Sequence, residues 1–263
     1  MYLDIISKMR KWLILFLCII GILFLFYRWQ AFDDQQFVST YSKDFTTVSQ
    51  KVGKSIRFKS ENYRYLIFKI EKSESVELIA NFEKASSTQN LLKNNKCKKA
   101  INGSFISEKG MPIGYFKTRD KIYSSPSKNS LFIGYFLFDG EQFEINRAGP
   151  QSDTILGLQS GPLLLEDGKV LPVSLKTDKP ARRMIFGISK NNLAYGIAIF
   201  SDESELSGPL LDDLASLIYK ISDLENIYLK SAINLDGGKH SMFFDGANHI
   251  QELVSVGSVF CIK

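Results

Sequence analysis

Short apolar segments separated by polar turns dominate the chain after residue 54. Aromatic and β-branched residues are frequent in these segments, and several segments alternate apolar and polar positions, which is typical of β-strands. The run 131–138 (LFIGYFLF) is almost continuously apolar, which indicates a buried strand. The pattern as a whole predicts strands over residues 55–59, 63–70, 76–82, 131–138, 163–166, 169–173, 184–189, 193–200, 232–235 and 253–262.

Turn-forming residues join several of these strands. Asp167-Gly168 and the segment 190–192 each separate two predicted strands and therefore indicate hairpins. Asp139-Gly140 indicates a further turn. The segment 93–99 (KNNKCKK) is basic and rich in asparagine, and we interpret it as a solvated loop.

One clear helix is predicted in the last third of the chain. Its apolar residues recur at intervals of three and four, which places them on one face of a helix: Leu210, Leu211, Leu214, Leu217, Ile218 and Ile221. Gly208-Pro209 precedes this face, and Asp212 and Asp213 fall in the first turn, where the helix dipole favours acidic residues. The predicted fold class is therefore α+β, with mixed, mostly antiparallel sheets and a few packed helices.

The N-terminal segment carries a different signal. Between Lys11 and Arg28 the chain has no charged residue, and as a helix this stretch rises about 24 Å, slightly less than the hydrocarbon core of a bilayer. A cleaved signal peptide is the main alternative, but the bulky sequence Arg28-Trp29-Gln30 does not fit a cleavage site. We therefore expect residues 12–29 to form an uncleaved transmembrane helix.

Charge asymmetry around this helix predicts its orientation. Lys8, Arg10 and Lys11 precede it, against Arg28 alone after it, so the positive-inside rule places the N-terminus in the cytoplasm. The predicted organisation is a cytoplasmic N-terminus, a transmembrane anchor, a tether and an extracytoplasmic domain, over residues 1–11, 12–29, 30–54 and 55–263.

Composition excludes several classes of protein. The net charge of +5 is concentrated near the N-terminus, and the rest of the chain is too nearly neutral to suggest nucleic-acid binding. Two histidines and three cysteines are too few for most zinc fingers or histidine-rich metal sites. Cys97 and Cys261 would face an oxidising compartment, where they either pair or remain separate thiols; separate thiols are the favoured interpretation.

Three polar turns, each at the end of an apolar strand, are candidates for chemistry. They cover residues 101–105 (INGSF), 158–162 (LQSGP) and 233–238 (INLDGG), and Arg182-Arg183 begins another strand. Glycine lets a backbone approach a ligand closely, amide side chains suit sugar hydroxyls, and arginine suits a phosphate. A single such turn is more often only a turn. Alternate residues of a strand face opposite sides, so one of the two arginines is expected to be a solvated charge.

Two further residues have a plainer interpretation beside the functional one. His240 follows the Asp-Gly-Gly turn, and a general base and an ordinary loop residue fit it equally well. Ser160 lacks the first glycine of the Gly-x-Ser-x-Gly motif, which disfavours a serine hydrolase.

Taken together and in order, these motifs are more specific. NGSF, QSGPLLLEDGK, RRMIFG, a helix and INLDGGKHS follow one another, and this succession resembles the phosphodiester glycosidase family over about residues 63–263. The first motif differs from the family's Asn-Gly-Gly-Phe-Phe, and Lys239-His240-Ser241 replace the small residues that commonly follow Asp-Gly-Gly. The resemblance implies cleavage between a sugar's anomeric carbon and a phosphodiester oxygen.

The resemblance also implies roles for individual residues. Asp236 would be the principal carboxylate, as nucleophile, base or metal ligand, and Arg183, four residues before Gly187, would bind the phosphate. With Asn102 these are the expected catalytic residues. The expected substrate-binding residues, which include the glycines of an anion-binding backbone nest, are Gly103, Gln159, Ser160, Gly161, Asn234, Gly237, Gly238 and His240. Asp178 and Glu108 are weak candidates for a second carboxylate.

The predicted function is a membrane-anchored extracytoplasmic glycosidase that hydrolyses the sugar–phosphate bond of a glycan or sugar-1-phosphodiester. Its partners would be a sugar-phosphate or anionic glycan and the membrane, without nucleic acid. A non-catalytic glycan-binding or envelope-assembly module is the alternative. A metal-dependent phosphoesterase is disfavoured because the sequence has no clustered His or Asp pattern, and no cofactor is assigned.

Overall fold

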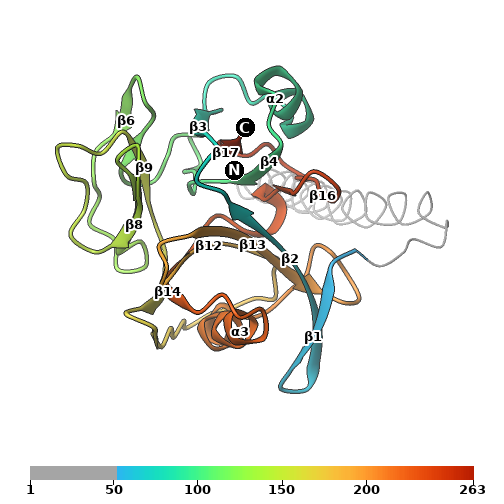
Figure 1. Cartoon of the computed structure of the whole chain (residues 1–263). Coiled ribbons are helices and arrows are strands. Elements are labelled where there is room, and N and C mark those ends of the chain that lie inside the picture. The colour runs from blue at the N-terminus through green and yellow to red at the C-terminus, as the bar shows by residue number, and fades with distance from the viewer. Residues whose placement is uncertain (1–51) are drawn as a thin grey trace, which may run out of the picture. The chain divides into compact units, whose positions relative to one another are not determined.

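The computed structural model describes residues 52–263, which form one compact unit (Figure 1). The predicted cytoplasmic N-terminus, the transmembrane anchor and nearly all of the tether lie outside the described residues. Within residues 52–263, no helix has both the length and the apolar character needed to cross a bilayer.

Three sheets make up the domain, and all their strand pairs are antiparallel, which confirms the predicted α+β class with mostly antiparallel sheets. The first sheet has seven strands. In spatial order these are β1 (Lys54–Phe58), β2 (Glu61–Ile70), β13 (Ala194–Ser201), β12 (Arg183–Ser189), β14 (Leu229–Asn234), β10 (Leu163–Glu166) and β11 (Lys169–Val170).

The other two sheets have five strands each. One contains β16 (His249–Ile250), β15 (Phe243–Phe244), β4 (Lys99–Asn102), β17 (Ser258–Ile262) and β3 (Val76–Ala80). The other contains β6 (Ile122–Ser124), β5 (Phe116–Lys117), β9 (Leu156–Ser160), β7 (Gly134–Phe138) and β8 (Phe143–Asn146).

Two apolar clusters form most of the core. The first lies between the sheets and contains Phe136, Phe186 and Phe260. The second lies between the seven-stranded sheet and helix α3 (Leu211–Leu224), whose predicted apolar residues Leu214, Leu217 and others are buried in it. Figure 1 shows α3 against one face of strands β12, β13 and β14, with β3, β4 and β17 beyond the opposite face.

Local sequence pattern predicted the hairpins β10–β11 and β12–β13 and helix α3 correctly. Four predicted strands are shorter than expected: β3 ends at Ala80, β11 ends at Val170, and β7 and β17 begin late because a side chain or a loop binds the backbone before them. Asn129 accepts hydrogen bonds from the N–H groups of Leu131 and Phe132, so β7 begins only at Gly134. The backbone N–H groups of residues 253 and 254 donate to the carbonyl of Lys239 and not to a neighbouring strand, and β17 begins only at Ser258.

The prediction of a loop over residues 93–99 was correct only for residues 96–98, because helix precedes them and strand β4 follows. Residues 93–95 belong to helix α2 (Thr88–Asn95), which the Ser87 hydroxyl caps by accepting from the N–H of Asn90. Leu92 anchors the helix in a small third apolar cluster. The helix ends at Lys96, whose left-handed backbone conformation terminates it.

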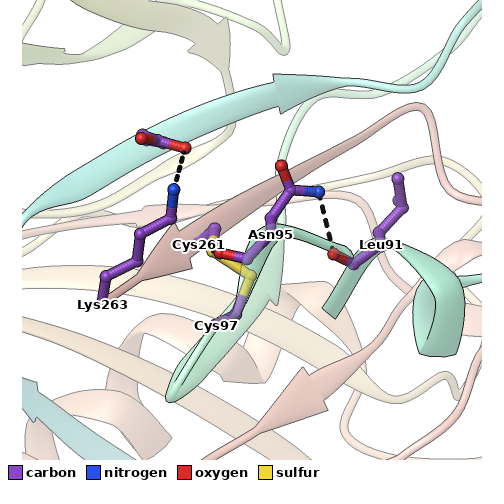
Figure 2. Close-up of a disulfide and its surroundings, with 6 residues drawn as sticks. Leu91, Asn95, Cys97, Cys261 and Lys263 are labelled. Atoms are coloured by element: carbon purple, nitrogen blue, oxygen red, sulfur yellow. Dashed lines mark hydrogen bonds and ion pairs between the residues drawn. A yellow bond between two sulfur atoms is a disulfide. The ribbon is translucent and has the colours of Figure 1, made fainter. Parts of the chain in front are cut away.

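Cys97 and Cys261 form a disulfide, so the interpretation as two separate thiols was wrong. Their Cα atoms are 5.2 Å apart although 164 positions separate them in the sequence. Figure 2 shows the bond beside Asn95, at the end of α2. The disulfide therefore ties α2 to β17, the strand that pairs with β4.

Candidate functional site

Four predicted segments meet where strands β4, β9, β12 and β14 end or begin. The N–H of Asp236 donates to the carbonyl oxygen of Gly103 (3.3 Å), and the N–H of Asn234 donates to the carbonyl oxygen of Pro162 (3.1 Å). On the other side of β14, the N–H of Leu235 donates to the carbonyl of Met184 (2.8 Å). The backbones of the INGSF, LQSGP and INLDGG turns and of the arginine pair are therefore in direct contact.

Alternation along the strands places two of the predicted side chains, those of Asn234 and Arg183, on one side of the seven-stranded sheet. Ala232, two residues before Asn234 on β14, is buried in the second apolar cluster, so Asn234 faces the side of α3. Ile185 packs in the second cluster, beside α3, which puts Arg183 on that side too.

Asp236 has the most unusual environment of these groups. The residue is 9% exposed, and its Oδ1 accepts a hydrogen bond from the N–H of Gly237 (2.9 Å). Burial raises the pKa of Asp236 to about 7, and the Gly237 hydrogen bond opposes this shift. A carboxyl group that titrates near neutral pH can give or take a proton during a reaction.

Asn102 holds the backbone beside this carboxyl group. Its Nδ2 donates to the carbonyl of Asp236 (2.8 Å), and its Oδ1 accepts from the N–H of Met242 (2.9 Å). Asn102 is 1% exposed. The amide therefore joins the end of β4 to the segments on either side of η1 (Gly238–His240) and positions Asp236.

Three of the four glycines of the predicted anion nest already donate their N–H groups within the protein. The N–H of Gly103 donates to the backbone carbonyl of Ser258, and the N–H of Gly238 donates to the backbone carbonyl of Arg182. The N–H of Gly237 donates to the Asp236 side chain. Close packing also restricts these positions, because a Cβ on Gly237 would lie 2.7 Å from the Arg182 carbonyl oxygen. An anion nest made of these groups stays a prediction, and it requires that these bonds be exchanged.

Ser160, Gly161 and Asn234 form a second contact between strand ends. Ser160 Oγ donates to the Asn234 carbonyl (2.7 Å), and Asn234 Nδ2 donates to the Gly161 carbonyl (3.0 Å). Within residues 52–263, the buried Oδ1 of Asn234 has no hydrogen-bond partner.

Gln159 has a structural role. Its Oε1 accepts from the N–H groups of Tyr115 and Ser127, and its Nε2 donates to the carbonyls of Ser127 and Phe132. All four bonds go to backbone, which uses the full hydrogen-bonding capacity of the amide. Contact between Gln159 and a substrate stays a prediction.

Arg183 points toward the start of α3. Its Nε donates to the Pro209 carbonyl (2.9 Å). Its Nη2 donates to the backbone carbonyl of Lys179 and to Asp178 Oδ1 (3.3 Å). Asp178 Oδ2 in turn accepts from the N–H of Asp212 in the first turn of α3. Burial lowers the pKa of Arg183, and Asp178 opposes that shift. No hydrogen bond or ion pair joins Arg183 to Asp236 in the described part of the chain.

Arg182 is the important residue that the sequence did not reveal. The prediction that one arginine of the pair is a solvated charge was wrong, because Arg182 is 1% exposed and Arg183 is largely buried as well. Arg182 binds the carbonyls of Gly238, Ser241 and Gln251 and the Ser241 hydroxyl. Arg182 therefore holds the loop that follows Asp236. In the sequence, only its position next to Arg183 indicated that it could belong to the site.

The remaining candidates, His240, Glu108 and Asp178, have no hydrogen bond or ion pair with the Asp236 carboxyl group among the described residues. His240 Nδ1 donates to the Ser255 carbonyl (3.1 Å), since a carbonyl oxygen can only accept. Glu108 is exposed on a loop, and Asp178 is tied to Arg183 and α3. Residues 52–263 contain no group of three or more His, Cys, Asp or Glu side chains arranged to hold a metal ion.

These features define an α+β protein whose antiparallel strand ends surround one buried carboxyl group of near-neutral pKa. The sequence model of the phosphodiester glycosidase family matches residues 95–263, and the chain belongs to that family. The match includes every predicted site residue and confirms the resemblance seen in the motifs.

Solved structures share the fold at low sequence identity. A hypothetical protein from Synechocystis superposes with a TM-score of 0.63 at 13% identity, over 80% of this chain and 61% of that protein. The catalytic domain of zebrafish N-acetylglucosamine-1-phosphodiester alpha-N-acetylglucosaminidase, auto-inhibited by its pro-peptide, superposes with a TM-score of 0.54 at 14% identity, over 81% of this chain and 86% of that domain. The chain thus spans about three fifths of the Synechocystis protein. No curated protein matches the sequence.

Proposed function

We propose that this protein hydrolyses sugar-1-phosphodiesters. Water adds to the anomeric carbon, the bond from that carbon to the phosphate oxygen breaks, and the products are a free sugar and a phosphate monoester. Because a phosphate monoester leaves readily, the protein mainly has to stabilise positive charge at the sugar and activate a nucleophile. Asp236 acts in its ionised form, as nucleophile or general base.

The observation that carries this proposal is the buried carboxyl group of Asp236 among converging strand ends. Membership of the phosphodiester glycosidase family supports the reaction type. Buried titratable groups with strongly shifted pKa values are concentrated at functional sites, which supports the choice of Asp236 over the exposed acids.

The same proposal places the domain outside the cytoplasm, held at the membrane by residues 12–29. The uncharged stretch between Lys11 and Arg28 supports the anchor. The Cys97–Cys261 disulfide supports the location, because disulfides persist mainly in oxidising compartments.

A matched pair of variants tests the chemistry. Full-length protein is incubated with methyl diesters of N-acetylglucosamine 1-phosphate and glucose 1-phosphate, and free reducing sugar is measured. Asp236→Asn should lower kcat at least about 1,000-fold, which is the scale expected for an essential group. Asp120→Asn, at an exposed position, should leave kcat unchanged. Full turnover by Asp236→Asn would refute the assigned role.

The pH dependence of the parent protein provides an independent check. Because the reaction needs ionised Asp236 and its pKa is about 7, kcat/KM should rise as pH increases from 6 to 8. A rate that falls over this range would instead assign the protonated carboxyl group as a general acid.

A non-catalytic glycan-binding role is the second candidate. The observation that favours it is the engagement of predicted substrate-binding groups within the protein, above all the four backbone hydrogen bonds of Gln159. Binding of an anionic polysaccharide without release of reducing sugar from any diester would support this role over hydrolysis.

A further inference from the structure

An apolar cleft adjoins the candidate site along the chain. It has a volume of about 440 Å³ and lies between the 130–133 segment, the start of β10 and the 171–175 segment. Its walls are mainly aliphatic side chains and prolines, which include Leu131, Pro162 and Val173. This volume is within the range of pockets that bind small molecules.

Hydrogen bonds connect one wall of the cleft to Asn234, the last residue of β14. Pro162 accepts from the N–H of Asn234, and the neighbouring Gly161 accepts from the Asn234 side chain. Leu131 is packed against Gly161 so closely that a Cβ there would lie 2.1 Å from its carbonyl oxygen. Asn234 is two residues before Asp236, which is about 7 Å along an extended strand.

The opposite wall leads to the arginine side of the site. The N–H of Leu175 donates to Asp212 Oδ1 in the first turn of α3 (3.1 Å). The N–H of Asp212 is bound by Asp178, which pairs with Arg183. The cleft therefore touches the Gly161 side of the site through Pro162, and its other wall is linked to Arg183 through Asp212 and Asp178.

The chemistry of the lining distinguishes between occupants. Of the residues that line the cleft, Arg147 alone is charged, and none has an aromatic ring or an amide side chain. Sugars are usually held by amides and by stacking on aromatic rings, so these walls suit a hydrocarbon chain better than a second sugar. Arg147 binds Glu166 through its Nε, at a partly exposed position on the rim.

We propose that this cleft binds the alcohol part of the substrate, and that this part is an alkyl or prenyl chain. The inference rests on the proposed function, because it names the substrate class as a sugar-1-phosphate ester of a long-chain alcohol. The anomeric carbon lies at Asp236, the phosphate lies beside it, and the alcohol chain extends past Leu131 into the cleft.

Two esters of the same sugar phosphate test the inference. The methyl and octyl diesters of N-acetylglucosamine 1-phosphate differ by seven methylene groups, and each methylene removed from water increases affinity about fourfold. With roughly half of them covered, kcat/KM for the octyl ester should exceed that for the methyl ester about 100-fold. Equal values for the two esters overturn the inference, and so does faster turnover of an ester with a second sugar as the alcohol.

A pair of valines supplies matched variants. Val173 lines the cleft, whereas Val170, in the same region, is 38% exposed and lies outside it. Val173→Asn should reduce the octyl preference about tenfold without changing the methyl ester rate, and Val170→Asn should change neither. An unchanged preference in Val173→Asn overturns the inference.

The outcome does not depend on turnover alone. If the full-length protein hydrolyses the methyl ester without any octyl preference, the proposed function stands and the cleft assignment fails. If it hydrolyses neither ester, the proposed function fails, and calorimetry with octyl phosphate still decides the cleft. Binding that Val173→Asn weakens and Val170→Asn does not supports the cleft, and absence of binding refutes it.

Discussion

Ionisation of Asp236 should destabilise the folded protein, and the pH dependence of stability should show it. The folded-state pKa of about 7 compares with the usual value of 3.8 for an aspartate. One pKa unit corresponds to about 1.4 kcal/mol, so full ionisation of Asp236 should lower the free energy of unfolding by about 4 kcal/mol.

The sign follows from the raised pKa. The folded state holds the proton more tightly than the unfolded state, so the stability is fully present below about pH 4 and is lost as pH rises through 7. Between pH 5 and pH 8 the loss from this one group should be about 2 to 3 kcal/mol. Asp236→Asn removes the titration and keeps a side chain of nearly the same shape.

The assay is urea unfolding of the full-length parent protein and of Asp236→Asn at pH 5 and pH 8, with Asp120→Asn as the exposed control. Other titrating groups act equally on parent and variant, so the difference between the two isolates Asp236. Relative to the parent, the free energy of unfolding of Asp236→Asn should be about 2 to 3 kcal/mol more favourable to the folded state at pH 8 than at pH 5. If parent and variant lose the same stability between the two pH values, the burial argument for Asp236 is refuted.

Three further predictions concern the disulfide and two residues around the site. Reduction of the Cys97–Cys261 disulfide, which spans 164 positions, should lower the free energy of unfolding by about 5 kcal/mol, measured by urea unfolding with and without reductant; an equal midpoint would contradict this. Arg182→Leu should destabilise by about 3 to 5 kcal/mol, because it leaves buried carbonyls of the loop after Asp236 without a donor, and Arg182→Lys should recover part of that loss; thermal unfolding of both variants checks it. Asp178→Ala should lower the free energy of unfolding by about 1 to 2 kcal/mol, since it removes the acceptor for the Asp212 N–H at the start of α3. An unchanged unfolding midpoint would show that water replaces this cap.

Features that depend on neighbouring residues could be predicted from the sequence. The β12–β13 hairpin follows from two apolar runs separated by a short polar turn, and α3 follows from apolar residues three and four positions apart. The order of the motifs was sufficient to predict the family. In each case the information lies within a few consecutive residues or in their order, which sequence shows directly.

Features that depend on distant residues required the tertiary structure. Gln159 was expected to bind substrate and one of the two arginines to be a solvated charge, and only the fold showed the backbone groups that Gln159 and Arg182 bind. Cys97 meets Cys261 only because α2 packs beside β17. The pKa of Asp236 belongs to the same category. Its residue type and its turn were visible in the sequence, but the burial that raises its pKa requires segments distant in the chain to pack around it, such as the end of β4, where Asn102 is 134 positions away. Burial is a property of how such segments pack, so folding alone decided which carboxyl group of this chain would titrate near neutral pH.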